Sequence, residues 1–204
     1  MPEQTRRRSP RGSGEELRGE IIAAARDLMA RATTADDVSI RSVAAAVGVT
    51  APSIYLHFAD KQELISAVVV DVFEELDRVM VSASHGVSEP LDRLKAKGRA
   101  YVRFALDHPE HYRLATMDPC PRPDVDLMLA QGCFVHFQEV VEECIAAGLF
   151  PAGDSTTLTI ELWSAAHGIA ALLVAKPDLP IGDPMAIADR VLDAAAIGHL
   201  VTRA

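Results

Sequence analysis

The chain has 204 residues, of which 49% are hydrophobic and 24% are charged, with a formal net charge of −9. This length permits a sizeable buried core, and the acidity argues against a protein that coats nucleic acid without sequence preference. Charge is divided unevenly: residues 1–61 hold nine basic and eight acidic side chains, net +1, which leaves eleven and twenty-one, net −10, in the remainder. Only the N-terminal part is therefore suited to approach DNA.

Residues 1–14 are predicted to form a disordered basic arm, because Arg6, Arg7, Arg8 and Arg11 stand among Pro, Ser and Gly without apolar periodicity. Two roles remain open for this arm: extra phosphate or minor-groove contacts, or a solvated extension without a role. No secretory signal and no stretch of about twenty apolar residues is found, so we expect a cytoplasmic protein without a membrane partner.

Residues 39–64 predict two short helices joined by a tight turn and followed by the start of a third helix. Ser39 is placed to cap the first helix, and Gly48 ends it with the left-handed conformation that permits a sharp turn. Thr50 caps the second helix, and Pro52 lies in its first turn, where a missing N–H costs nothing. This spacing predicts a helix-turn-helix, which either reads a DNA major groove or serves as a plain packing element.

The second helix of this unit has an inner, apolar face and an outer face. Ile54 and Phe58, four residues apart, are predicted to face inward and hold the helix on its neighbours. Asp60 and Glu63 have the spacing of a capping box at the start of the third helix. Lys61 lies in that first turn, where a phosphate could meet both its ammonium and the helix N-terminus.

The run from Arg41 to Leu64 resembles the signature of the tetracycline-repressor (TetR-like) transcriptional regulators. The resemblance implies an all-α fold, with an N-terminal three-helix bundle carrying the helix-turn-helix and a C-terminal helical domain for ligand binding and dimerisation. It implies a DNA-binding domain over 15–60 and an effector-binding and dimerisation domain over 61–204. The DNA contacts that it implies are Thr50, Ala51 and Ser53 in the groove, Tyr55, His57 and Lys61 on phosphates, and Arg41 on the DNA backbone.

Apolar residues recur at helical spacing along the rest of the chain, and no stretch alternates like a half-buried strand. Turns with Pro or Gly separate the helices, Asp154 and Asp183 are expected as caps, and a Pro-rich loop at 118–123 is a candidate for a mobile segment. The predicted helices are Leu17–Ala32, Leu64–Val81, Leu91–Leu106, Val125–Ala147, Leu158–Val174 and Met185–Val201.

Catalytic motifs are missing from the sequence. It has no His-Glu-x-x-His, no Gly-x-Ser-x-Gly and no phosphate-binding glycine loop, and most of its Asp and Glu residues are interpreted as caps and solvated faces. An all-α enzyme is therefore the weaker alternative, and neither a cofactor nor a metal is predicted.

Three cysteines, Cys120, Cys133 and Cys144, are an odd number without close pairing, so free thiols are expected. Cys133, Phe137 and Cys144 fall on one helical face, and His136 lies three residues from Cys133. This arrangement leaves open a thiol- or metal-responsive DNA-binding regulator, against the simpler interpretation that the cysteines pack as small hydrophobic residues.

The segments 108–114 and 161–168 resemble a subgroup of TetR-like regulators whose C-terminal domain carries Trp, His and Gly, here Trp163, His167 and Gly168. Trp163 and His167 share a helical face, so they either point into an effector cavity or form a core pair. The effector is predicted to be a small apolar or aromatic molecule. The candidate effector-binding residues are Tyr101, Phe104, Tyr112, Met117, Met128, Phe134, Phe137, Trp163 and His167.

Residues 158–174 and 185–201 are rich in Ala, Leu, Val and Ile, and they are predicted to form a homodimer interface. The resemblance implies a four-helix bundle there, which would place two recognition helices about 34–36 Å apart on a near-palindromic operator in double-stranded DNA. Effector binding would then tilt the helix that begins at Asp60 and release the operator, with repression as the family's usual sign.

Overall fold

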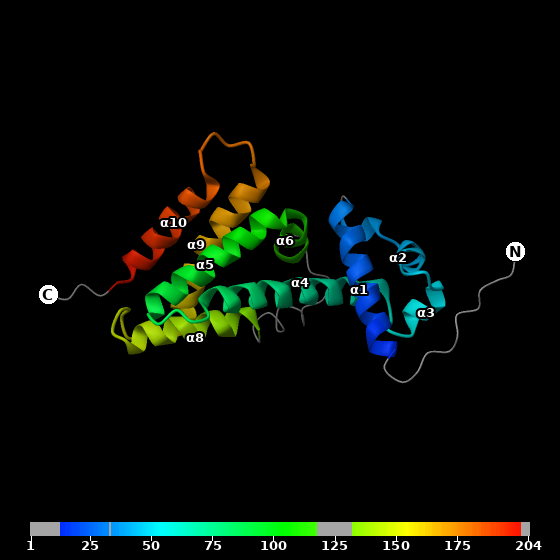
Figure 1. The fold of residues 1–204 in the computed structure, drawn as a ribbon, viewed down its shortest axis with the longest axis horizontal. Coiled ribbons are helices and arrows are strands. Elements are labelled where there is room, and N and C mark those ends of the chain that lie inside the picture. The colour runs from blue at the N-terminus through cyan, green and yellow to red at the C-terminus, as the bar shows by residue number, and fades with distance from the viewer. Residues whose placement is uncertain (1–12, 33, 118–131, 201–204) are drawn as a thin grey trace, which may run out of the picture. The chain divides into compact units, whose positions relative to one another are not determined.

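The computed structural model describes residues 13–32, 34–117 and 132–200, and every regular element within them is helical (Figure 1). The predicted all-α fold is confirmed. The described residues form two compact units that divide between Val68 and Val69, inside a single long helix. We call the unit up to Val68 the head and the unit from Val69 onward the body.

The head consists of short helices around one small core. Its elements are α1 (Ser13–Arg31), the 3-10 helix η1 (Ala35–Asp37), α2 (Ile40–Val47), α3 (Ala51–Tyr55) and the first turns of α4 (Lys61–Ser84). Ser13 and Gly14, which the sequence analysis assigned to the basic arm, form the first turn of α1, and residues 1–12 lie outside the described part of the chain. The core is formed by Ile21, Ala25, Met29, Val43, Ile54, Phe58, Leu64 and Val68.

The predicted signals of the helix-turn-helix are present. Ser39 caps α2, since its hydroxyl accepts a hydrogen bond from the Ser42 N–H at 3.0 Å, and the Ser42 hydroxyl accepts one from the Ser39 N–H at 3.1 Å. Gly48 ends α2 with φ 75°, in the left-handed region that glycine adopts without steric cost. Ile54 and Phe58 are buried as predicted.

Two of the predicted caps use different partners. Thr50 precedes α3 as expected, but its hydroxyl lies 2.9 Å from the Ser53 hydroxyl and caps no backbone N–H. Asp60 accepts from the Glu63 N–H at 2.7 Å, whereas the Glu63 carboxylate accepts from the Ala59 N–H and not from that of Asp60. Residue types predict that a cap exists, but side-chain rotamers decide which N–H it satisfies.

The body continues along α4 and adds five further described helices. They are α5 (Pro90–Asp107), α6 (Pro109–Thr116), α8 (Cys133–Ala146), α9 (Ser155–Ala175) and α10 (Pro184–Gly198). Helix α5 packs against α6, α8, α9 and α10, so it lies at the centre of the bundle. Asp154 and Asp183 cap α9 and α10 as predicted.

Helix α6 was not among the predicted helices. Prolines were expected to mark the turns between helices, but Pro109 opens a helix of eight residues, where its fixed φ is favourable. The first residues of the predicted helix at 125–147, together with the Pro-rich loop, Cys120 and Met128, lie outside the described residues, and the described helix begins at Cys133.

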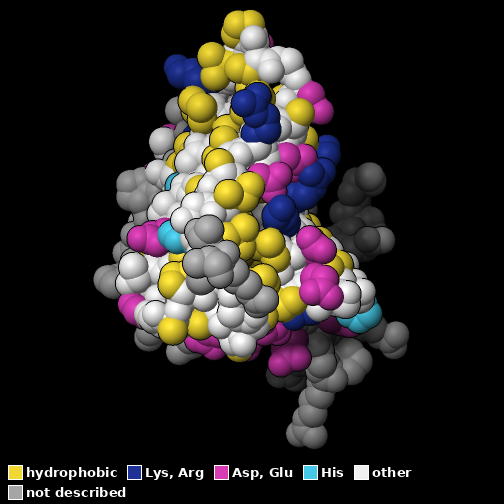
Figure 2. Space-filling model, turned by 90° about the vertical axis from the view of Figure 1, so that its left-hand side faces the viewer, with side chains coloured by type: hydrophobic (Ala, Val, Ile, Leu, Met, Phe, Trp, Pro, Cys, Tyr) yellow, Lys and Arg dark blue, Asp and Glu magenta, His cyan; other side chains and the backbone are white. Residues whose placement is uncertain are grey.

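Helix α9 is long and apolar enough to cross a membrane by length and composition. It packs against α5, α8 and α10, and the residues that it buries there include Leu158, Leu162, Ile169 and Leu173. Its exposed apolar residues include Ile160 and Leu172, and Ile197 is exposed on α10. At the end of the body where α10 lies, hydrophobic side chains spread beside a strip of mixed charge (Figure 2).

Candidate functional site

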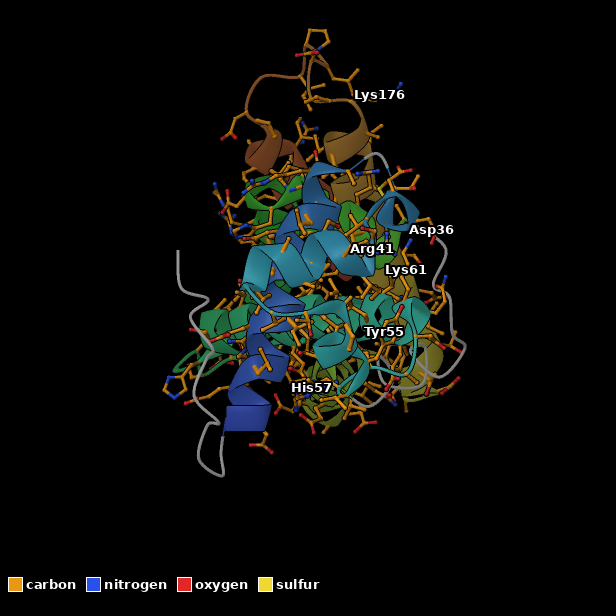
Figure 3. All side chains as sticks on the ribbon, turned by 90° about the vertical axis from the view of Figure 1, so that its right-hand side faces the viewer. Asp36, Arg41, Tyr55, His57, Lys61 and Lys176 are labelled. Carbon is orange, nitrogen blue, oxygen red and sulfur yellow. The ribbon has the colours of Figure 1, made fainter. Side chains whose placement is uncertain are left out.

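Helix α3 presents the small residues that were predicted to read DNA. Thr50 is exposed, and Ala51 and Ser53 are half-buried at the start of the helix. Tyr55 at the end of α3 is 54% exposed, and His57 follows in the turn (Figure 3). Small side chains at a helix start let the backbone approach base edges, while hydroxyl and imidazole groups reach phosphate oxygens.

Lys61 and Arg41 supply positive charge near this helix. Arg41 is exposed on α2, and Lys61 opens α4 with its ammonium held against η1, as Figure 3 shows. The Lys61 Nζ donates to the Asp36 carbonyl oxygen at 2.5 Å and lies 3.3 Å from the Asp36 carboxylate. Lys61 is therefore held in a fixed position, but Asp36 offsets part of its charge.

Leu56 is a surface residue of the head that the sequence analysis missed. It is 85% exposed between Tyr55 and His57. A large apolar side chain this exposed is available for contact with a partner surface, such as a thymine methyl group. The spacing of the inward pair Ile54 and Phe58 already places Leu56 on the outer side of the helix, which is the signal that could have identified it.

The body contains a partly open apolar cavity of about 40 Å³ between α4, α5, α8 and α9. This volume holds a few water molecules, at roughly 10–15 Å³ each, so a larger ligand must displace side chains. Four of the predicted effector-binding residues line it: Tyr101, Phe134, Phe137 and Trp163. The other lining residues are Phe73, Leu76, Met80, Gly98, Cys133 and Ala166, and none of the ten is charged.

Tyr112 and His167 form a polar cluster with Tyr101. The Tyr112 and Tyr101 hydroxyls lie 2.8 Å and 3.0 Å from the His167 Nδ1, and 3.3 Å from each other. Burial lowers the pKa of His167 and raises the pKa of both tyrosines, so a neutral imidazole and two protonated hydroxyls are favoured. His167 Nδ1 is thus already hydrogen-bonded by core side chains.

The remaining candidates lie away from the cavity lining. Phe104 packs on His108, with ring centroids 5.1 Å apart, and Met117 is exposed at the end of α6. Tyr112 and His167 do not line the cavity either. Periodicity cannot separate these residues from the lining, because both groups occupy apolar helix faces.

The two described cysteines are poorly suited to sensing. Cys144 is buried, and Cys133 lines the cavity with its Sγ 3.6 Å from the Met80 Sδ. Burial raises the pKa of Cys133 to about 12 and that of Cys144 to about 11, which suppresses the reactive thiolate. Within the described ranges, no group of three or more His, Cys, Asp or Glu could hold a metal ion.

We expect iodoacetamide at pH 8 to label Cys133 and Cys144 in the folded protein at least about 100-fold more slowly than in the urea-unfolded chain. The reason is the raised pKa of each thiol, which leaves far less thiolate at pH 8 than in an exposed cysteine. Mass spectrometry of the labelled peptides measures both rates. Equal rates in the two states would restore the thiol-responsive alternative.

Two family descriptions match the chain. Residues 21–68 match "Bacterial regulatory proteins, tetR family", and residues 94–195 match "Tetracyclin repressor-like, C-terminal domain". The second match alone spans half of the chain. The chain belongs to the TetR family. The TetR-family assignment makes it a DNA-binding transcriptional regulator and not an enzyme.

Solved structures share the TetR-family fold over nearly the whole chain. A protein of unknown function from Rhodococcus sp. RHA1 is 25% identical, with a TM-score of 0.78 over 98% of this chain and 100% of that one. A putative TetR-family regulator from Shewanella sp. PV-4 is 15% identical, with a TM-score of 0.74 over 91% and 99%. RolR in complex with resorcinol is 18% identical, with a TM-score of 0.68 over 93% and 90%. No curated protein matches the sequence.

Proposed function

We propose that this regulator is a homodimeric repressor that leaves a near-palindromic operator when a small, largely apolar molecule binds in the body. The observation that carries the proposal is the presence, in one chain, of a helix-turn-helix head and a separate helical body with an apolar cavity. We further propose that it acts in the cytoplasm and belongs to the subgroup marked by Trp163, His167 and Gly168.

The head supports two kinds of DNA contact, one in the major groove and one with phosphates. Thr50, Ala51 and Ser53 would enter the major groove, because they are the small residues at the start of α3. Polar and basic side chains around them would hold phosphates and so position the helix without reading sequence. These are Tyr55, His57, Lys61 and Arg41.

Helices α9 and α10 support a dimer interface. Ile160 and Leu172 on α9 are exposed, and Gly168 between them leaves open space where a Cβ would stand. A helix of a second copy could approach closely at such a small residue, and Ile197 on α10 would add apolar area. A two-fold axis through these helices would present two heads to successive major grooves.

The cavity supports a small effector that acts through α4. Phe73, Leu76 and Met80 line the cavity on the same helix that Lys61 opens in the head. A ligand that fits the cavity better in one position of α4 than in another would shift the population toward that position. RolR, which shares the fold, is described in complex with the small aromatic molecule resorcinol, in keeping with an aromatic effector here.

The experiment that tests this function is a selection of bound fragments from a random library of double-stranded DNA. We expect the purified protein to enrich a near-palindrome whose half-sites are about 10–10.5 base pairs apart, or a multiple of this, as two-fold symmetry requires. Sequencing of the retained DNA is the measurement. A verified dimer that enriches no sequence at physiological salt would contradict the proposal.

Two variants at Lys61 and Asp36 serve as controls on the selected operator. Lys61→Met should weaken binding about tenfold and lower the slope of log K against log salt by about one, as loss of one phosphate contact does. Asp36→Asn should strengthen binding a few-fold at low salt, because it removes a carboxylate 3.3 Å from the Lys61 ammonium. If Lys61→Met left the slope of log K against log salt unchanged, Lys61 would not contact a phosphate.

A further inference from the structure

Lys97 on α5 is a largely buried lysine whose ammonium forms no close ion pair. Its side chain is 4% exposed, and it makes no hydrogen bond or ion pair with any residue that the structure describes. The nearby acids are engaged elsewhere: Asp77 lies 2.8 Å from the His136 Nδ1, and Glu143 pairs with Arg93. Among the described residues, the Lys97 Nζ is not one of the buried polar atoms that lack a hydrogen bond, so it reaches water beside the helix, where an anion could bind it.

Lys97 lines a groove of about 490 Å³ along α4, α5 and α8. The groove and the apolar cavity are lined from the same three helices, and on each helix a residue of the groove is next in sequence to a residue of the cavity. The neighbouring pairs are Asp77 with Leu76, Lys97 with Gly98, and His136 with Phe137. Cys133, which lines the cavity, lies within electrostatic range of the Lys97 ammonium, so the two spaces are close to each other at this point. A cation therefore stands beside a space that has no charge of its own.

We propose that the effector is an amphipathic carboxylic acid, whose aromatic or alkyl body fills the apolar cavity and whose carboxylate binds the Lys97 ammonium. This inference rests on the proposed effector function and specifies the class of molecule. The cavity supplies the apolar contacts, and Lys97 supplies a charge-assisted hydrogen bond, which orients the ligand and selects acids over neutral analogues.

The charges around Lys97 favour an anion over a second cation or a neutral group. The acids facing it are Asp77, Glu139 and Glu143, and the bases beside them in the groove are Arg78, Arg93 and His136. Asp77 and Glu143 already contact His136 and Arg93, and Glu139 is exposed, where water screens it. Of the charged groups in this groove, the Lys97 ammonium would therefore be stabilised most by a bound anion.

Binding of a carboxylate to Lys97 should also change the number of protons that the protein binds. Burial lowers the pKa of Lys97, with Asp77 the largest opposing influence. A bound carboxylate would raise this pKa, so binding should take up protons wherever the pH lies between the two values. An apolar or neutral ligand would not produce this uptake, and neither would a purely structural lysine.

The test uses the full-length protein and three matched pairs of probes. The acids are benzoate, phenylacetate and 4-phenylbutyrate, and the neutral counterparts are benzyl alcohol, 2-phenylethanol and 4-phenylbutanol. Trp163 is the single tryptophan and lines the cavity, so its fluorescence reports occupancy. Calorimetry in buffers of different ionisation enthalpy measures proton uptake. Lys97→Met is the test variant, Lys97→Arg retains the charge, and Lys95→Met removes a lysine that pairs with Asp193 on α10.

We expect the acids to bind better than the alcohols, with proton uptake. Lys97→Met should weaken acid binding about 10- to 100-fold and leave the alcohols unchanged. Lys97→Arg should keep the preference for acids, as should Lys95→Met. Lys97→Met should also fold, since an apolar side chain suits a buried site.

Three results would overturn the proposal: unchanged acid affinity in Lys97→Met, equal weakening of acids and alcohols, or no binding of any acid to the wild-type protein. Release of the selected operator is measured separately with the same probes. If only the alcohols released the operator, the chain would still have an effector, but the effector would not be a carboxylic acid. Operator binding that no occupant of the cavity changes would remove the effector function itself.

Discussion

Replacement of Phe58 with alanine is expected to destabilise the head by about 3–5 kcal/mol and to abolish operator binding. Phe58 is 1% exposed in the core of the head, and the Arg18 guanidinium lies 5.1 Å from the centre of its ring. A unit this small has little stability to lose, because its core is limited by its size. Hydrogen exchange measured by mass spectrometry should show faster exchange in α1, α2 and α3, with α5, α9 and α10 unchanged.

Tyr55→Ala is the matched control, since it removes an aromatic ring three residues earlier that is 54% exposed. We expect it to leave hydrogen exchange in the head unchanged and to weaken operator binding by loss of a contact alone. If Phe58→Ala left exchange in α1–α3 at the wild-type rate, the core of the head would not depend on this ring. Faster exchange throughout the body would show that the two units unfold together.

The elements of the head could be predicted from the sequence because its signals are local. Ser39, Gly48 and Pro52 each act within one helical turn, so residue type and spacing are enough to place helix ends. The partners of the caps were less predictable. Ser42 completes the cap of α2, and Glu63 reaches Ala59, because these contacts depend on rotamers and not on spacing.

The cavity could be predicted only in part, because it depends on contacts between distant segments. Tyr101 and Tyr112 look alike in the sequence, but the first lines the cavity and the second is held behind it by His167. Lys97 gave no signal at all, since a lysine on an amphipathic helix is normally assigned to the solvated face. Its side chain is largely buried only because α4 and α8 line the same groove as α5.

Ala51→Asp is expected to weaken operator binding by at least about 100-fold, or roughly 3 kcal/mol, while the head stays folded. Ala51 opens α3, where a carboxylate is favourable to the helix because the N-terminal N–H groups lack partners. If this face enters the major groove, the same carboxylate would stand among phosphates with no cation beside it, and like-charge repulsion would dominate. Fluorescence anisotropy with the selected operator measures the affinity.

Ala51→Asn separates charge from size, because asparagine has nearly the same shape as aspartate and no charge. We expect Asn to cost only a small part of the affinity lost with Asp, and the gap between the two to narrow as salt rises. Equal losses would mean that the groove tolerates no larger side chain at this position, which would make the contact steric. Wild-type affinity in both variants would mean that α3 does not face DNA, and Lys61 and Arg41 would then have to hold the operator through another surface of the head.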